Sequence, residues 1–208
     1  NDIGNGSFYA NDVVDAENLH EVSLTPGSAN IDTPTVSASG GLVEMNMVDP
    51  SHRRGGMVDL SYGSYNTSRE FIRLESGDIG HSGVRMYGSF SNVHGNDWRG
   101  PGKILAKQAD FKLVKDWKDG SRSALVMSYA DQDTQEDLYP TLANYEKYGN
   151  SQNYNYSANP GGTNYYKLHR NMFQSMMLSM PNKIVAGHNI TVNDTPYFYY
   201  GYGNGGAA

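Results

Sequence analysis

The sequence contains no cysteine, and only 18% of its residues are charged. Without cysteine, disulfide frameworks, thiolate zinc sites, iron–sulfur clusters and cysteine nucleophiles are excluded. The 16 lysines and arginines are outnumbered by 22 aspartates and glutamates, giving a formal net charge of −6. That balance argues against a nucleic-acid partner, because phosphate binding needs a basic surface. No apolar run approaches the roughly 18 residues of a transmembrane helix, whereas membrane β-barrels hide their apolar residues in alternation.

Alternating apolar and polar residues are abundant from residue 56 onward, and helical periodicity is scarce. Ile72 and Leu74, for example, fall on one side of an extended chain and Arg73 on the other. Such alternation predicts half-buried strands. The predicted strands cover residues 58–63, 69–75, 84–91, 108–113, 123–129, 174–180 and 188–193.

The connections between these strands predict an antiparallel meander with unequal ends. After a tight turn at Tyr65–Asn66, short connections (77–83, 116–120, 181–187) alternate with long ones (94–105, 131–167), and residues 201–208 read as a loop. Short periplasmic turns and long extracellular loops are typical of outer-membrane barrels. Strand pattern alone leaves a soluble sandwich or barrel equally open.

The composition of the predicted strand faces favours the membrane barrel. The polar faces are charged, and the apolar faces are sparse in bulk, with Gly88 and Ala109 among their residues. A wet lumen and a lipid-facing exterior would produce that pattern. Aromatic residues near the strand ends are candidates for the girdles at the membrane interfaces. These aromatic candidates are Tyr62, Tyr87, Trp117 and Tyr129.

The first fifty residues differ from the rest, because they lack regular alternation and are rich in Asp, Asn, Ser, Thr and Gly. Two short strands are predicted there, at residues 21–24 and 41–47, and Asp49–Pro50 ends the second. The shift in composition places a boundary near residue 50. Residues 1–50 and 51–208 are therefore expected to form separate units.

Three stretches resemble the plug-to-barrel junction of TonB-dependent outer-membrane receptors. They are residues 18–28 (NLHEVSLTPGS), 40–45 (GGLVEM) and 61–67 (SYGSYNT), and they occur in the family's order. Thr25–Pro26 and Glu44 depart from the family's usual residues. Upstream, residues 4–12 (GNGSFYAND) are similar to a stretch of hydroxamate-siderophore receptors.

The resemblance implies an all-β fold, a transmembrane antiparallel β-barrel with a plug in its lumen. Residues 1–50 would be the C-terminal part of the plug, and 51–208 the first six or seven strands, with their loops, of a larger barrel. It implies a receptor in the bacterial outer membrane, surrounded by outer-membrane lipid, that takes up a scarce solute. A TonB-type energy-transducing protein would act through an N-terminal segment missing from this chain.

Aromatic residues in the predicted loops are the candidate ligand-binding groups, because rigid amphipathic rings suit a bulky polar ligand. A ferric siderophore is the favoured ligand, and an oligosaccharide is the alternative. Trp98 and Arg99 provide a ring for stacking and a cation for an anionic ligand. The resemblance adds Phe8 and Tyr9, which would face the ligand from the plug apex. The loop tyrosines chosen are Tyr139, Tyr145 and Tyr148.

No catalytic constellation is visible, so the chain is expected not to be an enzyme and to hold no cofactor or metal. The acidic run at 131–137 lacks the full pattern of a calcium loop and reads as a solvated loop. A soluble secreted β-domain that binds glycans through Tyr-rich loops remains an alternative, as does a TonB-dependent carbohydrate transporter. A simple porin is disfavoured, since it has no use for residues 1–50.

Overall fold

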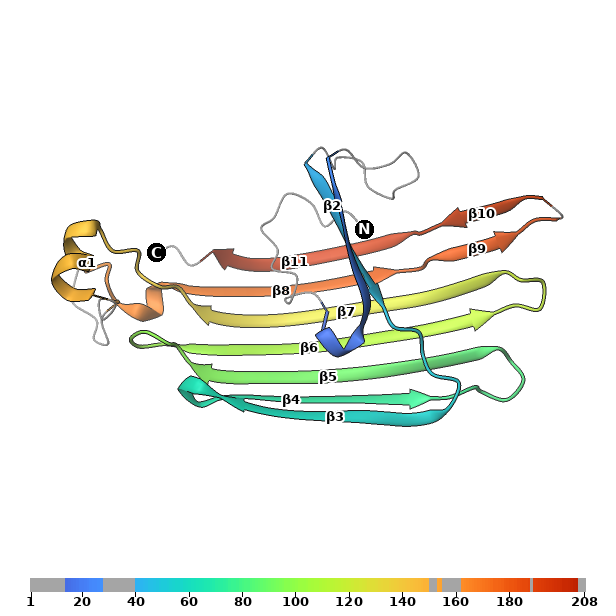
Figure 1. Cartoon of the computed structure of the whole chain (residues 1–208), viewed down its shortest axis with the longest axis horizontal. Coiled ribbons are helices and arrows are strands. Elements are labelled where there is room, and N and C mark those ends of the chain that lie inside the picture. Colours follow the sequence, from blue (N-terminus) through green and yellow to red (C-terminus); the bar gives the residue numbers. More distant parts are fainter. Residues whose placement is uncertain (1–13, 28–39, 150–152, 155–161, 188, 206–208) are drawn as a thin grey trace.

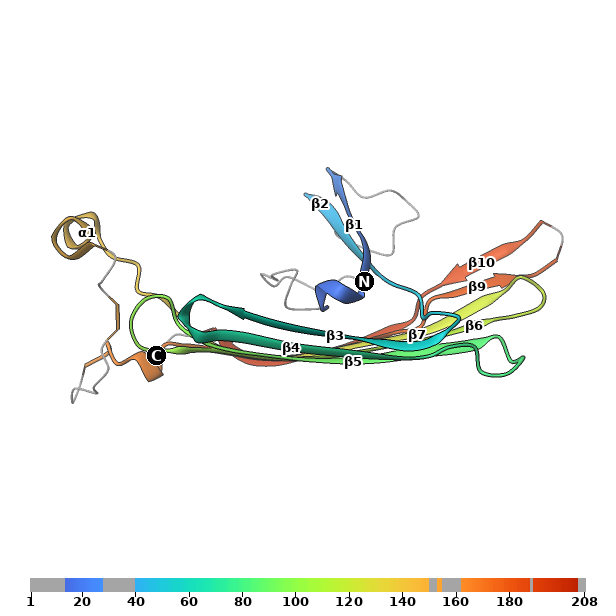
Figure 2. The ribbon, with the colours of Figure 1, turned by 60° about the horizontal axis from the view of Figure 1, so that its bottom comes forward.

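The computed structural model describes residues 14–27, 40–149, 153–154, 162–187 and 189–205. In this part of the chain, nine strands form one antiparallel sheet, and two more form a hairpin that rises from one face of it (Figures 1 and 2). The hairpin consists of β1 (Leu19–Pro26) and β2 (Gly41–Met47). The sheet contains β3 (Arg54–Gly63), β4 (Thr67–Ser76), β5 (Val84–Asn96), β6 (Lys103–Asp116), β7 (Arg122–Gln135), β8 (Arg170–Ser179), β9 (Asn182–Val185), β10 (Thr191–Asp194) and β11 (Tyr197–Gly205).

The sheet is a meander in which each strand pairs with the next one along the chain from β3 to β8. After β8 the chain continues as β9 and returns as β10 and β11, which pair with β9 and β8. Pro181 separates β8 from β9, because proline has no N–H to give to a ladder. Within the described residues, β3 forms one edge and β10 and β11 form the other. Figure 2 shows that the sheet is open and gently curved.

The predicted antiparallel all-β fold is confirmed, and six of the predicted strands match β3 to β8. Most strands are longer than the alternation indicated. The predicted long connection at 94–105 is wrong, because β5 and β6 extend into it and leave only residues 97–102. Cross-strand pairing therefore continues past the point where the alternation in the sequence fades.

The predicted C-terminal loop is also wrong over residues 201–205, which belong to β11. Gly201 stands opposite Ser175, and Gly203 opposite Phe173. A Cβ at Gly203 would collide with the carbonyl oxygen of Met172, so the close approach of β8 requires glycine there. Glycine is normally depleted in strands, which is why this segment gave no strand signal.

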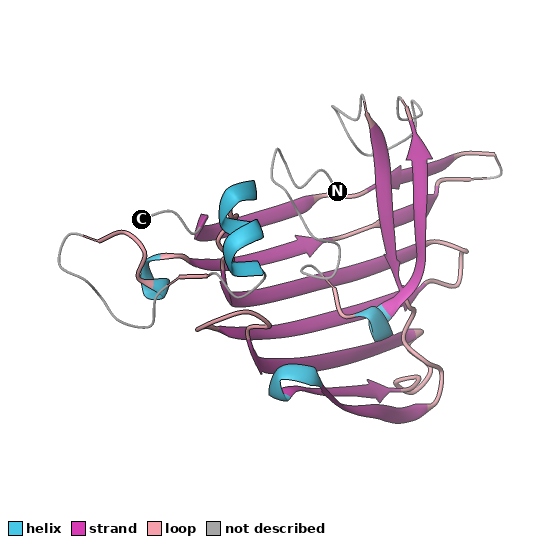
Figure 3. Cartoon of the chain, turned by 60° about the vertical axis from the view of Figure 1, so that its left-hand side comes forward, coloured by secondary structure: helices cyan, strands magenta, loops and turns pink. Residues whose placement is uncertain are grey.

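Helices are few in the described residues, and no helix there is long and apolar enough to span a membrane. The α-helix α1 (Leu142–Tyr148) lies in the connection between β7 and β8 (Figure 3). The Thr141 hydroxyl accepts a hydrogen bond from the Asn144 N–H at 3.3 Å and caps the helix N-terminus. Short 3₁₀-helices cover Ala16–Asn18, Ser64–Asn66 and Tyr166–Leu168.

Successive connections lie at alternate ends of the sheet. The loop end, on the left of Figure 1, carries residues 64–66 and 97–102 and the described part of the connection 136–169. The turn end carries residues 77–83 and 117–121 and the described part of the connection 186–190. The length difference between the two ends thus comes from the single connection 136–169. The chain leaves β2 and joins β3 at the turn end (Figure 1).

The two faces of the sheet differ in polarity. The covered face, from which the hairpin rises, carries the cross-strand row Arg73, Ser89, Asp110 and Ser128. The opposite, outward face carries the rows that follow, because neighbouring residues in a strand point to opposite sides. One outward row is Leu74, Gly88, Phe111, Met127, Leu178 and Phe198, and the next is Val58, Ile72, Phe90, Ala109, Tyr129, Met176 and Tyr200.

Large apolar side chains of the outward face are exposed: Leu74 is 63% exposed and Val58 64%. Of the aromatic residues expected near strand ends, Tyr62 and Trp117 lie at opposite ends of the sheet and are exposed. Tyr87 is a correction, because it is 1% exposed on the covered face, with the Arg73 guanidinium 5.5 Å from its ring.

Substitutions at two glycines of the turn 77–83 test how closely this turn packs against the end of β6. Both have a positive φ, +58° at Gly80 and +71° at Gly83. A Cβ at Gly80 meets open space, whereas one at Gly83 collides with the carbonyl oxygen of Asp116. We expect Gly80→Ala to lower the unfolding free energy by about 1 kcal/mol and Gly83→Ala by about 2–3 kcal/mol. Urea unfolding measures both, and equal losses would contradict this packing.

Candidate functional site

A short segment ahead of the hairpin packs against the covered face. Val14 and Asp15 are buried there, and Asn18 is 0% exposed. The 3₁₀-helix Ala16–Asn18 is closed by the Asn18 N–H, which donates to the Asp15 carbonyl at 2.9 Å. This turn directs the Asp15 and Asn18 side chains onto the sheet, where they contact strand residues.

Asp110 of β6 is the central acceptor beneath this segment. The Asn18 amide donates to the Asp110 carboxylate and to the Ser89 hydroxyl, each at 2.7 Å. The backbone N–H of Asp15 donates to the same carboxylate oxygen at 3.2 Å. The Ser91 hydroxyl donates to the Asp15 carboxylate at 2.7 Å. Buried polar groups far apart in sequence thus bind one another, although one oxygen of each carboxylate, Asp15 Oδ2 and Asp110 Oδ1, is buried without a hydrogen-bond partner among the described residues.

Arg69 of β4 joins the segment to the sheet by charge. Its guanidinium lies 2.9 Å from the Asp15 carboxylate and 2.5 Å from that of Glu17. Arg73, four residues further along β4 on the same face, donates to the Glu17 carbonyl oxygen at 2.7 Å. The hydrogen bonds from Arg69 lower the pKa of Glu17, and they outweigh the opposing effect of burial.

The end of β2 and the linker after it are held to the sheet in the same way. The Lys112 ammonium donates to the Met47 carbonyl at 2.7 Å and lies 3.0 Å from the Asp49 carboxylate. Arg122 pairs with Asp49 at 2.5 Å. Burial raises the pKa of Asp49, but these two cations outweigh it and lower the pKa. The covered face therefore holds residues 14–18 and 47–49 through these polar contacts, beside buried apolar side chains such as Val14, Phe71 and Val114.

At the loop end, the Asp137 carboxylate organises the connections 97–102 and 136–169. It accepts the Trp98 indole N–H at 2.7 Å and the Asn153 amide at 2.9 Å, and it pairs with Arg99 at 3.4 Å. Arg99 also donates to the Leu138 carbonyl at 2.7 Å. The Leu138 N–H in turn donates to the Asn153 side chain at 2.9 Å. We call these five residues the loop cluster.

The structure brings Trp98 and Arg99 together, with the guanidinium 5.0 Å from the indole ring. Arg99 is largely buried, and its charge faces Asp137. The Trp98 ring is half exposed, so its open surface is the accessible part of this pair. Burial and the nearby Asp137 carboxylate raise the pKa of Asp97.

The three loop tyrosines are exposed and are not among the residues of this cluster. Tyr139 directly follows Leu138 and is 90% exposed. Tyr145 and Tyr148 lie on α1, three residues apart and so on one side of the helix, and each is about half exposed. The predicted plug-apex pair, Phe8 and Tyr9, lies outside the described residues.

Some members of the loop end were missed by sequence reasoning. Asp137 belonged to an acidic run that read as solvated, and Asn153 was one amide among many in a loop. Tyr154 stacks on His169 with ring centroids 3.7 Å apart. No pattern along the chain indicates such long-range partners. Within the described residues, no group of three or more His, Asp or Glu side chains is placed to hold a metal ion.

The ion pair between Glu17 and Arg69 makes the docking of residues 14–18 depend on pH. The pKa of Glu17 is lower in the folded protein than in the unfolded chain, where it is about 4.5. The ion pair therefore contributes fully to the unfolding free energy above pH 4.5, and this contribution is lost as the pH falls through the folded pKa. We expect Glu17→Gln to lower the unfolding free energy by about 1–2 kcal/mol at pH 7. At pH 3 we expect a smaller difference in unfolding free energy between the variant and the unmodified protein. A gap of equal size at both pH values, measured by urea unfolding, would contradict the pair.

No protein-family model matches this chain, and neither a curated protein nor a solved structure matches it. Function therefore has to be inferred from the two faces of the sheet and from the loop end.

Proposed function

We propose that this chain is part of a TonB-dependent receptor of the bacterial outer membrane that binds and takes up a scarce solute. The described sheet would be a section of the barrel wall, and residues 1–50 the end of the plug. The observation that carries the proposal is the inverted polarity of the sheet. Its exposed face carries large apolar side chains, while its covered face buries charges and amides beside a few apolar side chains. In water the apolar face would be the one to bury.

The length of the apolar band supports a membrane exterior. Along β6, Lys107 and Lys115 share the outward face and enclose Ala109, Phe111 and Leu113. At ~3.4 Å per residue, the two lysines are separated by about 27 Å of strand, or about 21 Å along the normal at a tilt of ~40°. The apolar band of an outer-membrane barrel is about 25 Å tall. Charged residues thus return where such a band would end.

The covered face supports a hydrated lumen that holds a plug. Arg69, Asp15 and Glu17 form contacts that water can replace, which suits a segment that must be displaced without exposing a dry core. The linker from β2 to β3 lies at the turn end, which would face the periplasm. A TonB-type protein pulling from that side would break the polar contacts of residues 14–18 and open a path.

The ligand would bind at the loop end, between the plug and the exposed rings of Trp98 and Tyr139. A ferric siderophore is our first candidate, because it is bulky, polar and able to stack on aromatic rings. An oligosaccharide is the second, and one observation favours it: the Arg99 charge is already paired with Asp137. The accessible groups of the loop cluster are thus aromatic and uncharged, as a sugar requires.

A charge on the outward face tests the membrane assignment. Leu74→Arg places a cation in the apolar band and should destabilise the complete receptor, folded into lipid vesicles, by about 2–4 kcal/mol. Ser175→Arg is the matched control, since Ser175 lies on the covered face, between Ala130 and Gly201. If Leu74→Arg lowered the unfolding free energy by less than about 0.5 kcal/mol, the outward face would be in contact with water, and the proposal would be contradicted.

Ring removal tests the ligand site. We expect Trp98→Ala and Tyr139→Ala each to weaken binding of a ferric hydroxamate or an oligosaccharide about tenfold, because each deletes a stacking surface of about 1–1.5 kcal/mol. Trp117→Ala, at the turn end, is the control and should leave the affinity unchanged. Calorimetric titration of both ligand classes distinguishes the two candidates. Equal losses at Trp98 and Trp117 would place the site elsewhere.

A further inference from the structure

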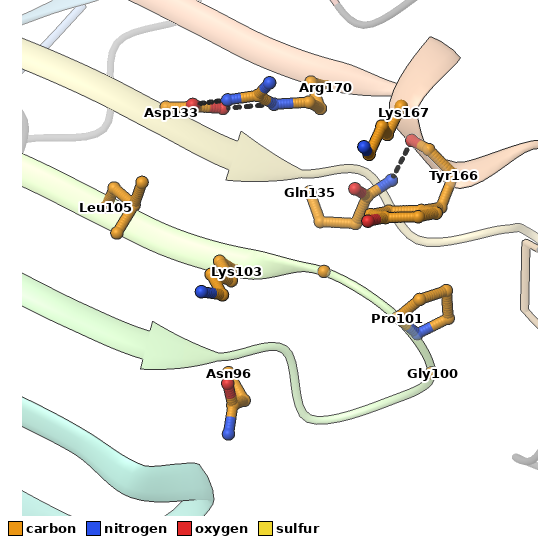
Figure 4. Close-up of a pocket in the computed structure, with 11 residues that line it drawn as sticks. Asn96, Gly100, Pro101, Lys103, Leu105, Asp133, Gln135, Tyr166, Lys167 and Arg170 are labelled. Atoms are coloured by element: carbon orange, nitrogen blue, oxygen red, sulfur yellow. Dashed lines mark hydrogen bonds and ion pairs between the residues drawn. The ribbon is translucent and has the colours of Figure 1, made fainter. Parts of the chain in front are cut away.

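A cavity of about 580 Å³ lies at the loop end, among the ends of β5, β6, β7 and β8 (Figure 4). Its lining is basic and amphipathic, with apolar surface from Leu105 and Pro101. Figure 4 shows Lys103 on β6 and Lys167 beyond β7 on two sides of the opening, with Arg170 on β8. The loop cluster does not contribute to this lining.

The register places this cavity on the outward face. Leu105 and Lys103 of β6 alternate with the covered-face residues, and they share a side with Phe111 in the apolar band. Leu105 stands opposite Asp133, and Asp133 stands opposite Met172, so these side chains share that side too. The cavity thus faces away from the segment 14–18, just beyond the loop-end limit of the apolar band.

The charges of the lining leave two cations available. Arg170 is paired with Asp133, with Nε 2.8 Å from the carboxylate. The Gln135 amide donates to the Tyr166 and His169 carbonyls, at 2.9 and 2.8 Å. Lys103 and Lys167 are exposed, and neither forms an ion pair among the residues that the structure describes. The pocket therefore carries an excess of positive charge beside an apolar wall.

We propose that this cavity binds the phosphate group of a membrane lipid in the leaflet at the loop end. Lys103 and Lys167 would hold the phosphate, and an acyl chain would pass over Leu105 and Met172, which are 40% and 42% exposed, onto the apolar band. A cationic pocket near the margin of an apolar surface, separated from it by the row Asn92, Lys107, Asp131, Gln174 and Tyr202, matches a charged headgroup joined to a hydrocarbon chain. The inference rests on the proposed function, because it takes the outward face as the lipid-facing one.

The test uses the complete receptor, of which this chain would be a section, in phosphatidylcholine nanodiscs that contain a small fraction of phosphatidic acid, whose headgroup is a bare phosphate. Native mass spectrometry measures how much phosphatidic acid the released protein retains. Each neutralised lysine should weaken retention about fivefold, and Lys103→Gln with Lys167→Gln about thirtyfold. Lys118→Gln removes the same charge at the turn end and is the control, with a change of less than twofold.

The outcomes separate this site from the membrane assignment. Retention that is unaffected by the double variant, or reduced equally by Lys118→Gln, would overturn the lipid site while leaving the barrel proposal in place. Displacement of the lipid by millimolar inorganic phosphate would assign the pocket to a free anion and would also overturn it. Failure of the complete receptor, of which this chain would be a section, to enter nanodiscs would overturn the proposed function, and the lipid site with it.

Discussion

The division of each strand into one polar and one apolar side is the constraint on which the structure depends. Because neighbouring residues point to opposite sides, register aligns the polar sides of β4 to β7 into one surface and the apolar sides into another. A shift of one residue in any pair would mix the two. Everything proposed here, from the plug contacts to the lipid pocket, follows from which surface is covered.

The covered surface is unusual because buried charges and amides lie beside its apolar side chains, such as Phe71 and Val114. Asp110 is 2% exposed and receives hydrogen bonds from Asn18 and Asp15. Removing such groups from water is costly unless partners replace the lost hydration. Residues 14–18 supply those partners through Asp15, Glu17 and Asn18. The interaction is specific in geometry, and because its groups are polar it is open to exchange with water.

The outward surface and the loop end divide the remaining chemistry. The outward surface offers apolar side chains with cationic lysines at its loop-end margin, an arrangement suited to lipid. The loop end offers exposed rings held by Asp137, which fixes Trp98 and Arg99 in one cluster. Solute and lipid would thus contact opposite sides of the same strands, which keeps the transported ligand separate from the surrounding bilayer.

The sequence by itself determined the strands, their antiparallel order and the tight turn at Tyr65–Asn66, because alternation and turn chemistry are local properties. It did not reveal β11, whose glycines form a strand only because β8 lies beside them. Nor did it reveal the Arg99–Asp137 pair or the burial of Tyr87. Only the tertiary structure decided which face is covered, since Arg69 meets Asp15 across 54 positions of the chain. Alternation creates two faces, and a long-range contact selects between them.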